Sequence, residues 1–278
     1  MSADTLVLQA YGDPAVVRSA RFCVATFQHF ALRAPGRYRV VVYTDAPGAF
    51  SDLGANVAVE PLDTPTLRRW RGAVDFVHRV KLELLLDFFA KYAAKALYVD
   101  SDTYFLADPA RVFDRTDPRT AFMHECEGRL IERKNGIFRK THRFVRTNDF
   151  PLSTGERVRI PETTEMWNAG VIGLHPDNRP LLRTALELTD AMYARYRKHV
   201  MEQLAVSYVL QTRLALLPAD DVVYHYWQFR AQLDDAVADL FRAQADASPV
   251  ELADAAYALR PRGTPVVRRR PWYARLFD

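Results

Sequence analysis

The chain has 278 residues, of which 49% are hydrophobic and 12% aromatic, so it is long enough for one large or two small domains with a sizeable core. It contains no run of about 18 apolar residues, and residues 1–12 lack the basic and apolar regions of a signal peptide, so we expect neither a spanning helix nor a leader. The net charge of +4 and the pI near 9.1 are compatible with phosphate-bearing partners, but no nucleic-acid-binding module is present. The two cysteines, Cys23 and Cys126, exclude a disulfide framework and indicate a reduced, cytoplasmic protein.

The first hundred residues alternate between strand and helix signals. Short apolar runs bounded by Gly, Pro and Asp predict buried strands, and apolar residues spaced three to four apart predict helices. On these grounds we expect strands over 6–11, 38–44 and 56–60, a further strand over 95–99, and helices over 15–32 and 77–92. Such alternation indicates an α/β fold with a mostly parallel sheet covered by helices.

The second half begins with a short strand over 120–123 and then loses its periodicity from 126 to 166. Between residues 128 and 160, nine Lys or Arg stand against three Asp or Glu. A long basic excursion inside an α/β domain is either a disordered loop or a functional lid and binding loop. After it we expect a strand over 168–174, helices over 180–213 with a break near 199–202, apolar runs at 214–217 and 222–227, and a helix over 234–243.

No internal repeat and no linker composition divides the chain. We therefore expect a single domain over residues 1–245, with residues 128–166 inserted as a basic loop, and a basic aromatic tail over 246–278. In open α/β sheets, ligands bind beyond the carboxyl ends of the strands. The predicted strands end near Tyr11, near Thr44 and at Asp100, so these ends are expected to line one crevice.

The most specific chemical signal is Asp100-Ser101-Asp102, directly after a predicted buried strand. Two carboxylates on alternate residues of a strand end can face one way, and without partners they would repel each other and resist ionisation. A divalent cation removes both problems, and hard cations such as Mg²⁺ or Mn²⁺ prefer oxygen ligands. The alternative is a turn that merely carries two acids, since Asp is common after strands.

Neither a GxGxxG fingerprint nor a GxxxxGK[ST] P-loop is present, so a cation would have to hold any phosphate groups. Arg79 and Lys81, near the start of a predicted helix, can pair with phosphate or with the site carboxylates, or can belong to a solvated helix face; of the two, we favour Lys81 as the functional cation. Tyr11 can stack on a base, and Thr44 or Asp45 can hydrogen-bond it. Equally, these three are ordinary strand-end residues.

The segment from His78 to Pro109, HRVKLELLLDFFAKYAAKALYVDSDTYFLADP, resembles the nucleotide-binding half of the GT-A-fold glycosyltransferases. Within them it is most similar to family eight, the glycogenin and bacterial galactosyltransferase group. Three later segments agree in order and rough spacing. Residues 167–173 (WNAGVIG) resemble that group's N-[AS]-G-[VI] strand, residues 202–205 (EQLA) its D-Q-x-x-L helix, and residues 223–226 (VYHY) the segment with its late metal-binding histidine. The resemblance spans roughly residues 5–230.

The resemblance implies the GT-A fold, with a Rossmann-like, mostly parallel central sheet flanked by helices. It implies that Asp100, Asp102 and His225 hold Mn²⁺ or Mg²⁺. The residues expected to contact the nucleotide-diphosphate sugar are Tyr11, Thr44, Asp45, Arg79, Lys81, Asp100, Ser101 and Gly170. The residues expected to carry the reaction at the sugar are Asn168, Glu202 and Gln203. The alternatives are a structural histidine between aromatic residues at 225, and a helix N-terminal acid with its neighbour at 202 and 203.

One part of the family pattern is missing. The family often continues its histidine as HxxGxxKPW, whereas here His225 is followed by Tyr-Trp-Gln-Phe-Arg. The contact of that Lys with the diphosphate therefore has no direct match, and Arg230 is a candidate replacement.

The expected function is metal-dependent transfer of a sugar from a nucleotide-diphosphate sugar, expected to be a UDP-sugar, to a glycan, glycolipid or other hydroxyl acceptor. The resemblance to family eight implies retention at the anomeric carbon. An inverting relative would need a carboxylate as general base, for which Glu162, Glu165 and Glu202 are candidates. The alternatives are a nucleotidyltransferase, which also uses paired carboxylates and metal, and a non-catalytic nucleotide-sugar-binding protein.

The end of the chain, residues 260–278, mixes six arginines with aromatic and aliphatic residues. Basic charge attracts anionic lipid and aromatic rings suit the membrane interface, so this tail predicts peripheral contact with the inner face of a membrane. The alternative is that the aromatic residues pack back on the fold, and the prolines of this segment argue against one continuous amphipathic helix.

Overall fold

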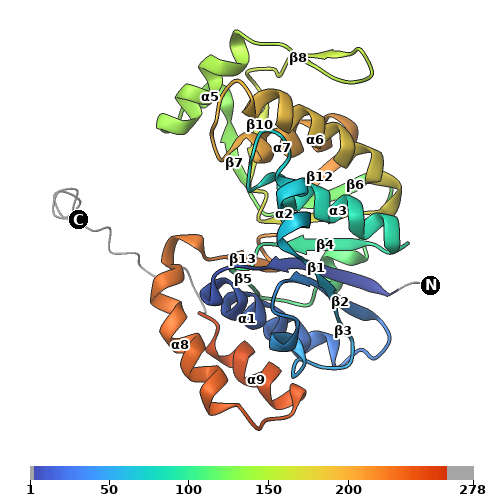
Figure 1. Cartoon of the computed structure of the whole chain (residues 1–278), viewed down its shortest axis with the longest axis vertical. Coiled ribbons are helices and arrows are strands. Elements are labelled where there is room, and N and C mark those ends of the chain that lie inside the picture. The colour runs from blue at the N-terminus through green and yellow to red at the C-terminus, as the bar shows by residue number, and fades with distance from the viewer. Residues whose placement is uncertain (1–2, 262–278) are drawn as a thin grey trace, which may run out of the picture.

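A seven-stranded sheet forms the centre of the molecule, with helices on both faces (Figure 1). The computed structural model describes residues 3–261. From edge to edge, the strands are β12 (Ala215–Pro218), β6 (Thr120–Met123), β11 (Val171–Leu174), β4 (Ala96–Val99), β1 (Asp4–Ala10), β2 (Tyr38–Thr44) and β3 (Val57–Pro61). Neighbours are parallel except at β11, which runs antiparallel to both β4 and β6. The predicted α/β fold with a mostly parallel sheet is confirmed.

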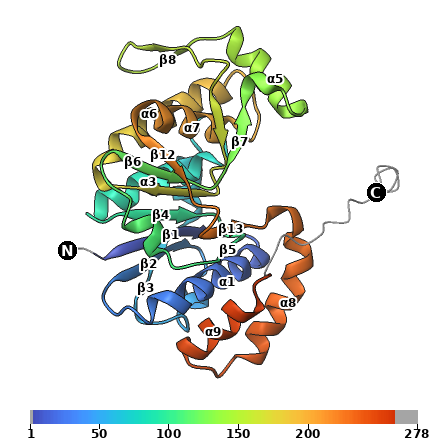
Figure 2. The ribbon, with the colours of Figure 1, turned by 180° about the vertical axis from the view of Figure 1, so that it is seen from behind.

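The sheet is buried on both faces because alternate strand residues enter different layers of the core. In β1, Leu6 and Leu8 pack in the layer beneath α1, whereas Val7 packs in the opposite layer with α3, α6 and α7. The two layers are visible above and below the sheet in Figures 1 and 2. The helices are α1 (Pro14–Ala31), α2 (Thr64–Arg71), α3 (Arg79–Lys91), α4 (Ala110–Phe113), α5 (Gly136–Arg146), α6 (Arg179–Tyr193), α7 (Met201–Arg213), α8 (Arg230–Ala243) and α9 (Pro249–Leu259).

Two short helices in the first half, α2 and α4, were not expected from the sequence. The helix α2 begins at a normal N-cap, where the Asp63 carboxylate accepts a hydrogen bond from the Thr66 amide at 2.8 Å. Trp70 is its one buried residue, so the helix lacks the repeated apolar positions that reveal an amphipathic helix.

Residues 126–166 are not the irregular loop that the sequence suggested. They contain β7 (Cys126–Arg129), a 3₁₀ turn η2 (Leu130–Glu132), α5, β8 (Phe150–Pro151), β9 (Arg157–Val158) and β10 (Glu165–Trp167). The helix α5 buries residues at helical spacing, namely Phe138, Thr141, His142 and Val145. This inner face contains only two strongly apolar side chains, and the outer face is basic. The sequence therefore lacks the apolar stripe by which a helix is recognised, although packing against the rest of the fold stabilises one here. Together with the β8–β9 ribbon, α5 projects at one end of the molecule (Figure 2).

The last third follows the predicted pattern. Helices α6 and α7 are separated by a break over 194–200, and two short 3₁₀ turns, η3 (Pro176–Asn178) and η4 (Trp227–Phe229), precede α6 and α8. A two-stranded antiparallel ribbon joins β13 (Val223–His225) to β5 (Thr103–Phe105). A fourth 3₁₀ turn, η1 (Pro47–Phe50), follows β2.

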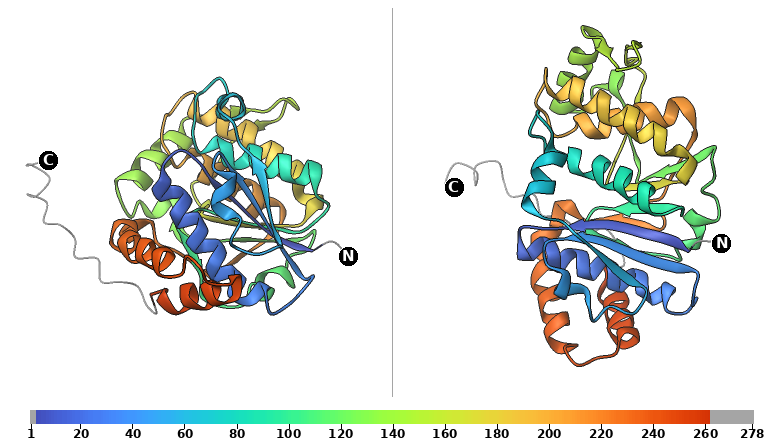
Figure 3. Two further views of the ribbon diagram at one scale, coloured as in Figure 1. Left: turned by 60° about the horizontal axis from the view of Figure 1, so that its bottom comes forward. Right: turned by 45° about the vertical axis from the view of Figure 1, so that its right-hand side comes forward.

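The helix α9 lies within the segment predicted as a tail, yet it packs on α1 beside α8 (Figure 3). The rings of His29 and Tyr257 stack at 3.9 Å, and Arg33 forms an ion pair with Asp254 at 2.7 Å. Residues 262–278 of the predicted tail lie outside the described residues. No helix within residues 3–261 has the length and apolar character needed to cross a bilayer.

Candidate functional site

The carboxyl edge of the sheet borders a cavity of about 760 Å³. The parallel strands β1 and β4 end here, so Tyr11 and Asp100 reach it from the residues that follow their strands. Because β11 runs in the opposite direction, the residues that precede it, 168–170, lie at this same edge. The Asp100 amide donates to the Gly170 carbonyl at 2.8 Å, which extends the β4–β11 ladder into the site.

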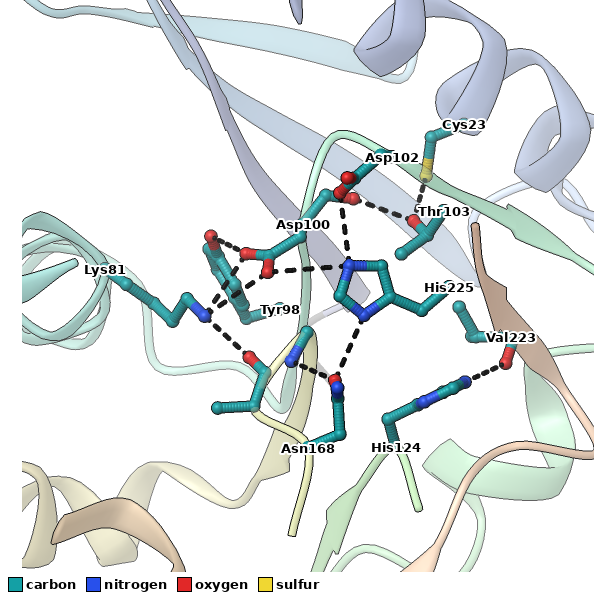
Figure 4. A network of polar contacts seen from close by, with 12 residues as sticks. Cys23, Lys81, Tyr98, Asp100, Asp102, Thr103, His124, Asn168, Val223 and His225 are labelled. Atoms are coloured by element: carbon teal, nitrogen blue, oxygen red, sulfur yellow. Dashed lines mark hydrogen bonds and ion pairs between the residues drawn. The ribbon is translucent and has the colours of Figure 1, made fainter. Parts of the chain in front are cut away.

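Asp100, Asp102 and His225 form a compact cluster at the floor of the cavity (Figure 4). The β5–β13 ribbon pairs His225 with Thr103, which brings the imidazole beside the preceding Asp102. His225 Nε2 lies 3.2 Å from Asp102 Oδ1 and 4.0 Å from Asp100 Oδ2. One ligand atom from each residue falls within 4.8 Å of the others, which is the spacing of a metal-ligand set.

The donor chemistry of this cluster fits a divalent cation. Asn168 Oδ1 accepts the Gly170 amide at 2.9 Å, which identifies that atom as the oxygen, and it lies 3.0 Å from His225 Nδ1. Nδ1 therefore donates to Asn168, which leaves Nε2 as the ring nitrogen that faces the two carboxylates. An imidazole nitrogen and two carboxylates facing one point are a ligand set that suits a divalent cation, and a second residue that orients the histidine is typical of metal sites.

Gly170 is required by the close approach of His225. A Cβ atom at position 170 would lie 2.3 Å from His225 Nδ1 and 2.9 Å from Asn168 Oδ1. Neither atom can move without breaking the contact that orients the imidazole. The absence of a side chain at 170 is thus a packing requirement of the cluster.

A buried ion-pair system lies beneath Asp100. The Lys81 ammonium donates to the Ala169 carbonyl at 2.7 Å and lies 3.2 Å from Asp100 Oδ1 and 3.6 Å from Glu202 Oε1. The Tyr98 hydroxyl donates to Asp100 Oδ1 at 2.8 Å. Burial opposes the charge of Lys81, but the carboxylates of Asp100 and Glu202 outweigh it and raise the pKa of Lys81.

The two carboxylates respond to this environment differently. Burial raises the pKa of Asp100, but Lys81, His225 and the Tyr98 hydroxyl outweigh it, so that the pKa of Asp100 is lowered. Burial raises the pKa of Glu202 to about 7, because the charge of Lys81 compensates only part of the lost hydration. Asp100 is therefore anionic at neutral pH, whereas Glu202 titrates near it.

Most of the residues singled out from the sequence line this one cavity. They are Tyr11, Lys81, Asp100, Ser101, Asp102, Asn168, Gly170, Glu202, Gln203 and His225. Arg230, the candidate replacement for the missing lysine, also lines it. Three of the predicted donor contacts do not: Thr44, Asp45 and Arg79 are absent from its lining.

Each of these three residues has a structural partner instead. The Arg79 guanidinium donates to Asp190 at 2.8 Å and to Glu83 at 2.7 Å, which ties α3 to α6 away from the cavity. The Thr44 hydroxyl accepts the Ala46 amide at 3.0 Å, and Asp45 accepts the Gly12 amide at 2.9 Å. The first of these two contacts stabilises the turn after β2, and the second joins the loops that follow β1 and β2.

Among the lining residues that sequence reasoning missed, Glu127 has the most contacts with predicted site residues. Glu127, in β7, accepts the side-chain amide of Asn168 at 3.1 Å and that of Gln203 at 2.9 Å. The signal that singled out Asp100 and Asp102, carboxylates on alternate residues after a strand, is repeated by Glu125 and Glu127 after β6. This second signal was not used because the segment that follows β6 looked irregular in the sequence.

Comparison with known proteins gives structural matches only. No protein-family model and no curated protein matches the sequence. The structure is similar to that of the galactosyltransferase LgtC in complex with donor and acceptor sugar analogs, with a TM-score of 0.51, 15% identity, and coverage of 77% of this chain and 73% of that chain. It is also similar to the bifunctional glycosyltransferase WbbM, with a TM-score of 0.50, 15% identity, and coverage of 78% of this chain.

The chain spans only 39% of the length of WbbM, so the similarity concerns one part of that protein. At 15% identity both matches describe the backbone arrangement and not the activity. The mixed sheet with a reversed β11, the covering helices and these matches agree with the expectation from the motifs. The chain therefore has the GT-A-like α/β fold of these glycosyltransferases.

Proposed function

We propose that this protein transfers a sugar from a nucleotide-diphosphate sugar to a hydroxyl acceptor in a reaction that depends on a divalent cation. The observation that carries the proposal is the Asp100, Asp102 and His225 cluster, whose ligand atoms lie within 4.8 Å of one another on the floor of a large cavity. A GT-A-like fold with such a cluster at the carboxyl edge of its sheet suits a diphosphate donor.

A Mn²⁺ or Mg²⁺ ion at these ligands would neutralise the diphosphate as the bond between sugar and phosphate breaks. The chain itself preorganises the ligands. Asn168 keeps Nε2 of His225 facing the two aspartates, and Lys81 keeps Asp100 anionic. Neither contact has to form during the reaction, so the site is ready before the donor arrives.

Other lining residues have the chemistry to hold the rest of the donor. Tyr11 offers a ring for the base, Ser101 a hydroxyl, and Arg230 a guanidinium for the diphosphate. Glu202 and Gln203, at the start of α7, offer hydrogen bonds to sugar hydroxyls. The donor that suits the motif resemblance is a UDP-sugar.

The reaction is proposed to retain the configuration at the anomeric carbon. Of the three carboxylates considered as the general base of an inverting reaction, only Glu202 lines the cavity. Glu162 contacts His142, and Glu165 accepts the indole N–H of Trp167. Proton NMR of the first product formed from an α-linked donor tests this proposal, because a β-linked product contradicts retention.

A donor screen tests the central proposal. UDP-, GDP- and dTDP-sugars are incubated with the protein with and without Mn²⁺, and nucleotide release and thermal stabilisation are measured. We expect one nucleotide class to stabilise the protein only when Mn²⁺ is present and to be turned over. Asp102→Asn is expected to weaken this metal-dependent binding by at least tenfold, because it removes a charged ligand.

Asp108→Asn is the matched control, because Asp108 lies outside the cavity and caps the turn before α4 by accepting the Ala110 amide at 2.9 Å. It should leave binding and turnover unchanged. The proposal fails if no nucleotide sugar binds, or if Asp102→Asn retains metal-dependent binding. Binding without turnover across a broad acceptor panel identifies a nucleotide-sugar-binding protein instead.

The acceptor is proposed to be a glycan or glycolipid, approached on the side of α5. The rim of the cavity includes the exposed Ile137 at the start of this helix and the exposed Trp227 of η4. The basic outer face of α5 and the Arg-rich composition of 260–278 suit an anionic membrane surface at the cytoplasmic side. Deletion of residues 266–278 should reduce sedimentation with anionic liposomes, and undiminished sedimentation removes the role of the tail.

A further inference from the structure

We infer that Glu127 determines donor specificity, because its carboxylate holds two side-chain amides and places a negative charge in the wall around the transferred sugar. Such a wall takes an uncharged hexose and rejects a hexuronic acid, whose ring carries a carboxylate in place of the C6 hydroxymethyl group. The inference rests on the proposed function and specifies its substrate class.

The starting observation is a carboxylate that joins two elements of the site. One oxygen of Glu127 accepts Asn168 Nδ2 at 3.1 Å, and the other accepts Gln203 Nε2 at 2.9 Å. The Asn168 amide is fixed at its other end too, because its oxygen accepts the Gly170 amide at 2.9 Å and lies 3.0 Å from His225 Nδ1. A continuous chain of contacts therefore runs from the metal-ligand cluster through Asn168 and Glu127 to Gln203.

These contacts determine which side-chain atoms are left to form hydrogen bonds with a ligand. Because Gln203 donates to Glu127, its carbonyl oxygen is left without a hydrogen-bond partner among residues 3–261. Glu202 Oε1 is buried beside the Lys81 ammonium, at 3.6 Å, so it is not open to a ligand. Gln203 and Glu127 both line the cavity, so the Gln203 carbonyl oxygen and the Glu127 carboxylate are acceptors of this wall. Sugar hydroxyls are the donors that such acceptors require.

The charged residues that line the cavity also disfavour an acidic sugar. Among the described residues, the Lys and Arg side chains that line the cavity are Lys81 and Arg230. Lys81 is already engaged by Asp100, Glu202 and the Ala169 carbonyl. Arg230, at the start of α8, is assigned to the diphosphate under the proposed function. A carboxylate on the sugar would therefore meet Glu127 with neither Lys81 nor Arg230 free to pair with it, and would be repelled.

The transferred sugar would lie beside this wall because the wall is close to the proposed metal ligands. The donor sugar is bonded to the phosphate that the cluster would hold. Asn168 alone bridges His225 and Glu127, so the wall begins one side chain away from the cluster. The position of Glu127 thus allows it to act on the sugar and not on the nucleotide.

Two donor pairs test the inference. UDP-glucose is compared with UDP-glucuronic acid, and UDP-galactose with UDP-galacturonic acid, by titration calorimetry in Mn²⁺ with UDP as the reference ligand. In the series whose hexose binds more tightly, the uronic acid is expected to bind at least tenfold more weakly. In Glu127→Gln this ratio should fall below threefold, because one amide contact and the repelling charge are both lost, while UDP affinity stays within threefold of wild type.

Glu125→Gln is the matched control. It removes an equal charge from the same cavity, but the exposed Glu125 carboxylate holds no side-chain amide, so the hexose-to-uronate ratio should stay within twofold of wild type. Glu127→Ala provides a second test if Glu127→Gln fails to fold. Equal binding of hexose and uronic acid by the wild type, or an unchanged ratio in both Glu127 variants, overturns the inference while Mn²⁺-dependent UDP binding upholds the proposed function. Absence of Mn²⁺-dependent binding by UDP, GDP and dTDP alike overturns both.

Discussion

His225 Nδ1 lies 3.0 Å from Asn168 Oδ1, and this contact determines which ring nitrogen faces Asp100 and Asp102. The amide oxygen can only accept, so the imidazole donates from Nδ1 and presents Nε2 to the two aspartates. Under the proposed function, Asn168 would act on the cation through another side chain and would be a positioning residue.

Asn168→Ala is expected to weaken Mn²⁺ binding by about 10- to 100-fold, the usual effect of losing a residue that orients a metal-ligating histidine. Electron paramagnetic resonance titration of free Mn²⁺ measures this directly. Asn178→Ala is the control, because Asn178 is also a buried asparagine that donates to a backbone carbonyl, that of Pro118 at 3.0 Å, but lies outside the cavity. An equal loss in both variants indicates general destabilisation and contradicts the positioning role.

Gly170→Ala is expected to abolish the ordered position of His225, since the added Cβ would lie 2.3 Å from Nδ1. Mn²⁺ affinity should fall at least tenfold, while circular dichroism shows the fold retained. Gly48→Ala is the matched substitution, because a Cβ at position 48 meets no atom within 4 Å. If Gly170→Ala binds Mn²⁺ as tightly as Gly48→Ala does, the packing requirement is refuted.

Glu202→Gln is expected to change how stability depends on pH in the metal-free protein. The folded-state pKa of Glu202 is about 7, above the model value of 4.5, so folding favours the protonated form. The stability that this group contributes is complete below pH 4.5 and is lost as the pH rises through about 7. The loss amounts to about 3 kcal/mol, since each pKa unit corresponds to about 1.4 kcal/mol.

Urea unfolding between pH 4.5 and 7.5 provides the measurement. The free energy of unfolding of wild type, minus that of Glu202→Gln, should decline across this range. Glu156→Gln, which changes an exposed carboxylate, controls for the loss of one acid. Parallel curves for wild type and Glu202→Gln count against the buried, shifted carboxyl group.

Arg79→Met should destabilise the fold and spare the site. Removing a buried guanidinium leaves Asp190 and Glu83 without their partner, and we expect a loss of about 2–4 kcal/mol, less than for a fully buried pair because both acids are partly exposed. Mn²⁺-dependent UDP affinity should change less than twofold. A large loss of UDP affinity at unchanged stability restores Arg79 as a donor contact.

The comparison of Arg79 with Lys81 shows what the sequence can and cannot predict. The helix itself was predicted, and so was the presence of a functional cation near its start. Residues two apart on a helix point about 200° away from each other, so only one of the two can face the site. Which one does so depends on the rotation of α3 against the sheet, and that is set by packing across the whole core.

The two aspartates were predictable because they come after β4, and parallel strands bring their ends to one edge of a sheet. His225, in the antiparallel β5–β13 ribbon, was predicted only from the motif resemblance. The helix α5 and the position of Glu127 were not predicted. Helix α5 buries only one face against the protein and displays arginines on the other, so its composition is that of a solvated segment. The role of Glu127 depends on its hydrogen bonds with the side-chain amides of Asn168 and Gln203, which are 41 and 76 residues away in the sequence. No local sequence pattern predicts these contacts.

The hydrogen bonds around the cluster make its backbone more rigid than the rim of the cavity. The Asp100 amide donates to the Gly170 carbonyl, the Asp102 carbonyl accepts the Tyr226 amide, and His225 pairs with Thr103, so the backbone of all three residues is held by hydrogen bonds at the end of a strand or ribbon. The rim, in contrast, carries the exposed side chains of Val77, Ile137 and Trp227 on a loop, a helix start and a 3₁₀ turn. Capture of a donor should therefore cost little ordering entropy at the floor and reshape only the rim. Because the residues at the floor are ordered before the donor binds, substitutions at the rim can alter the choice of acceptor without disturbing the proposed cation site, where the leaving group would be held.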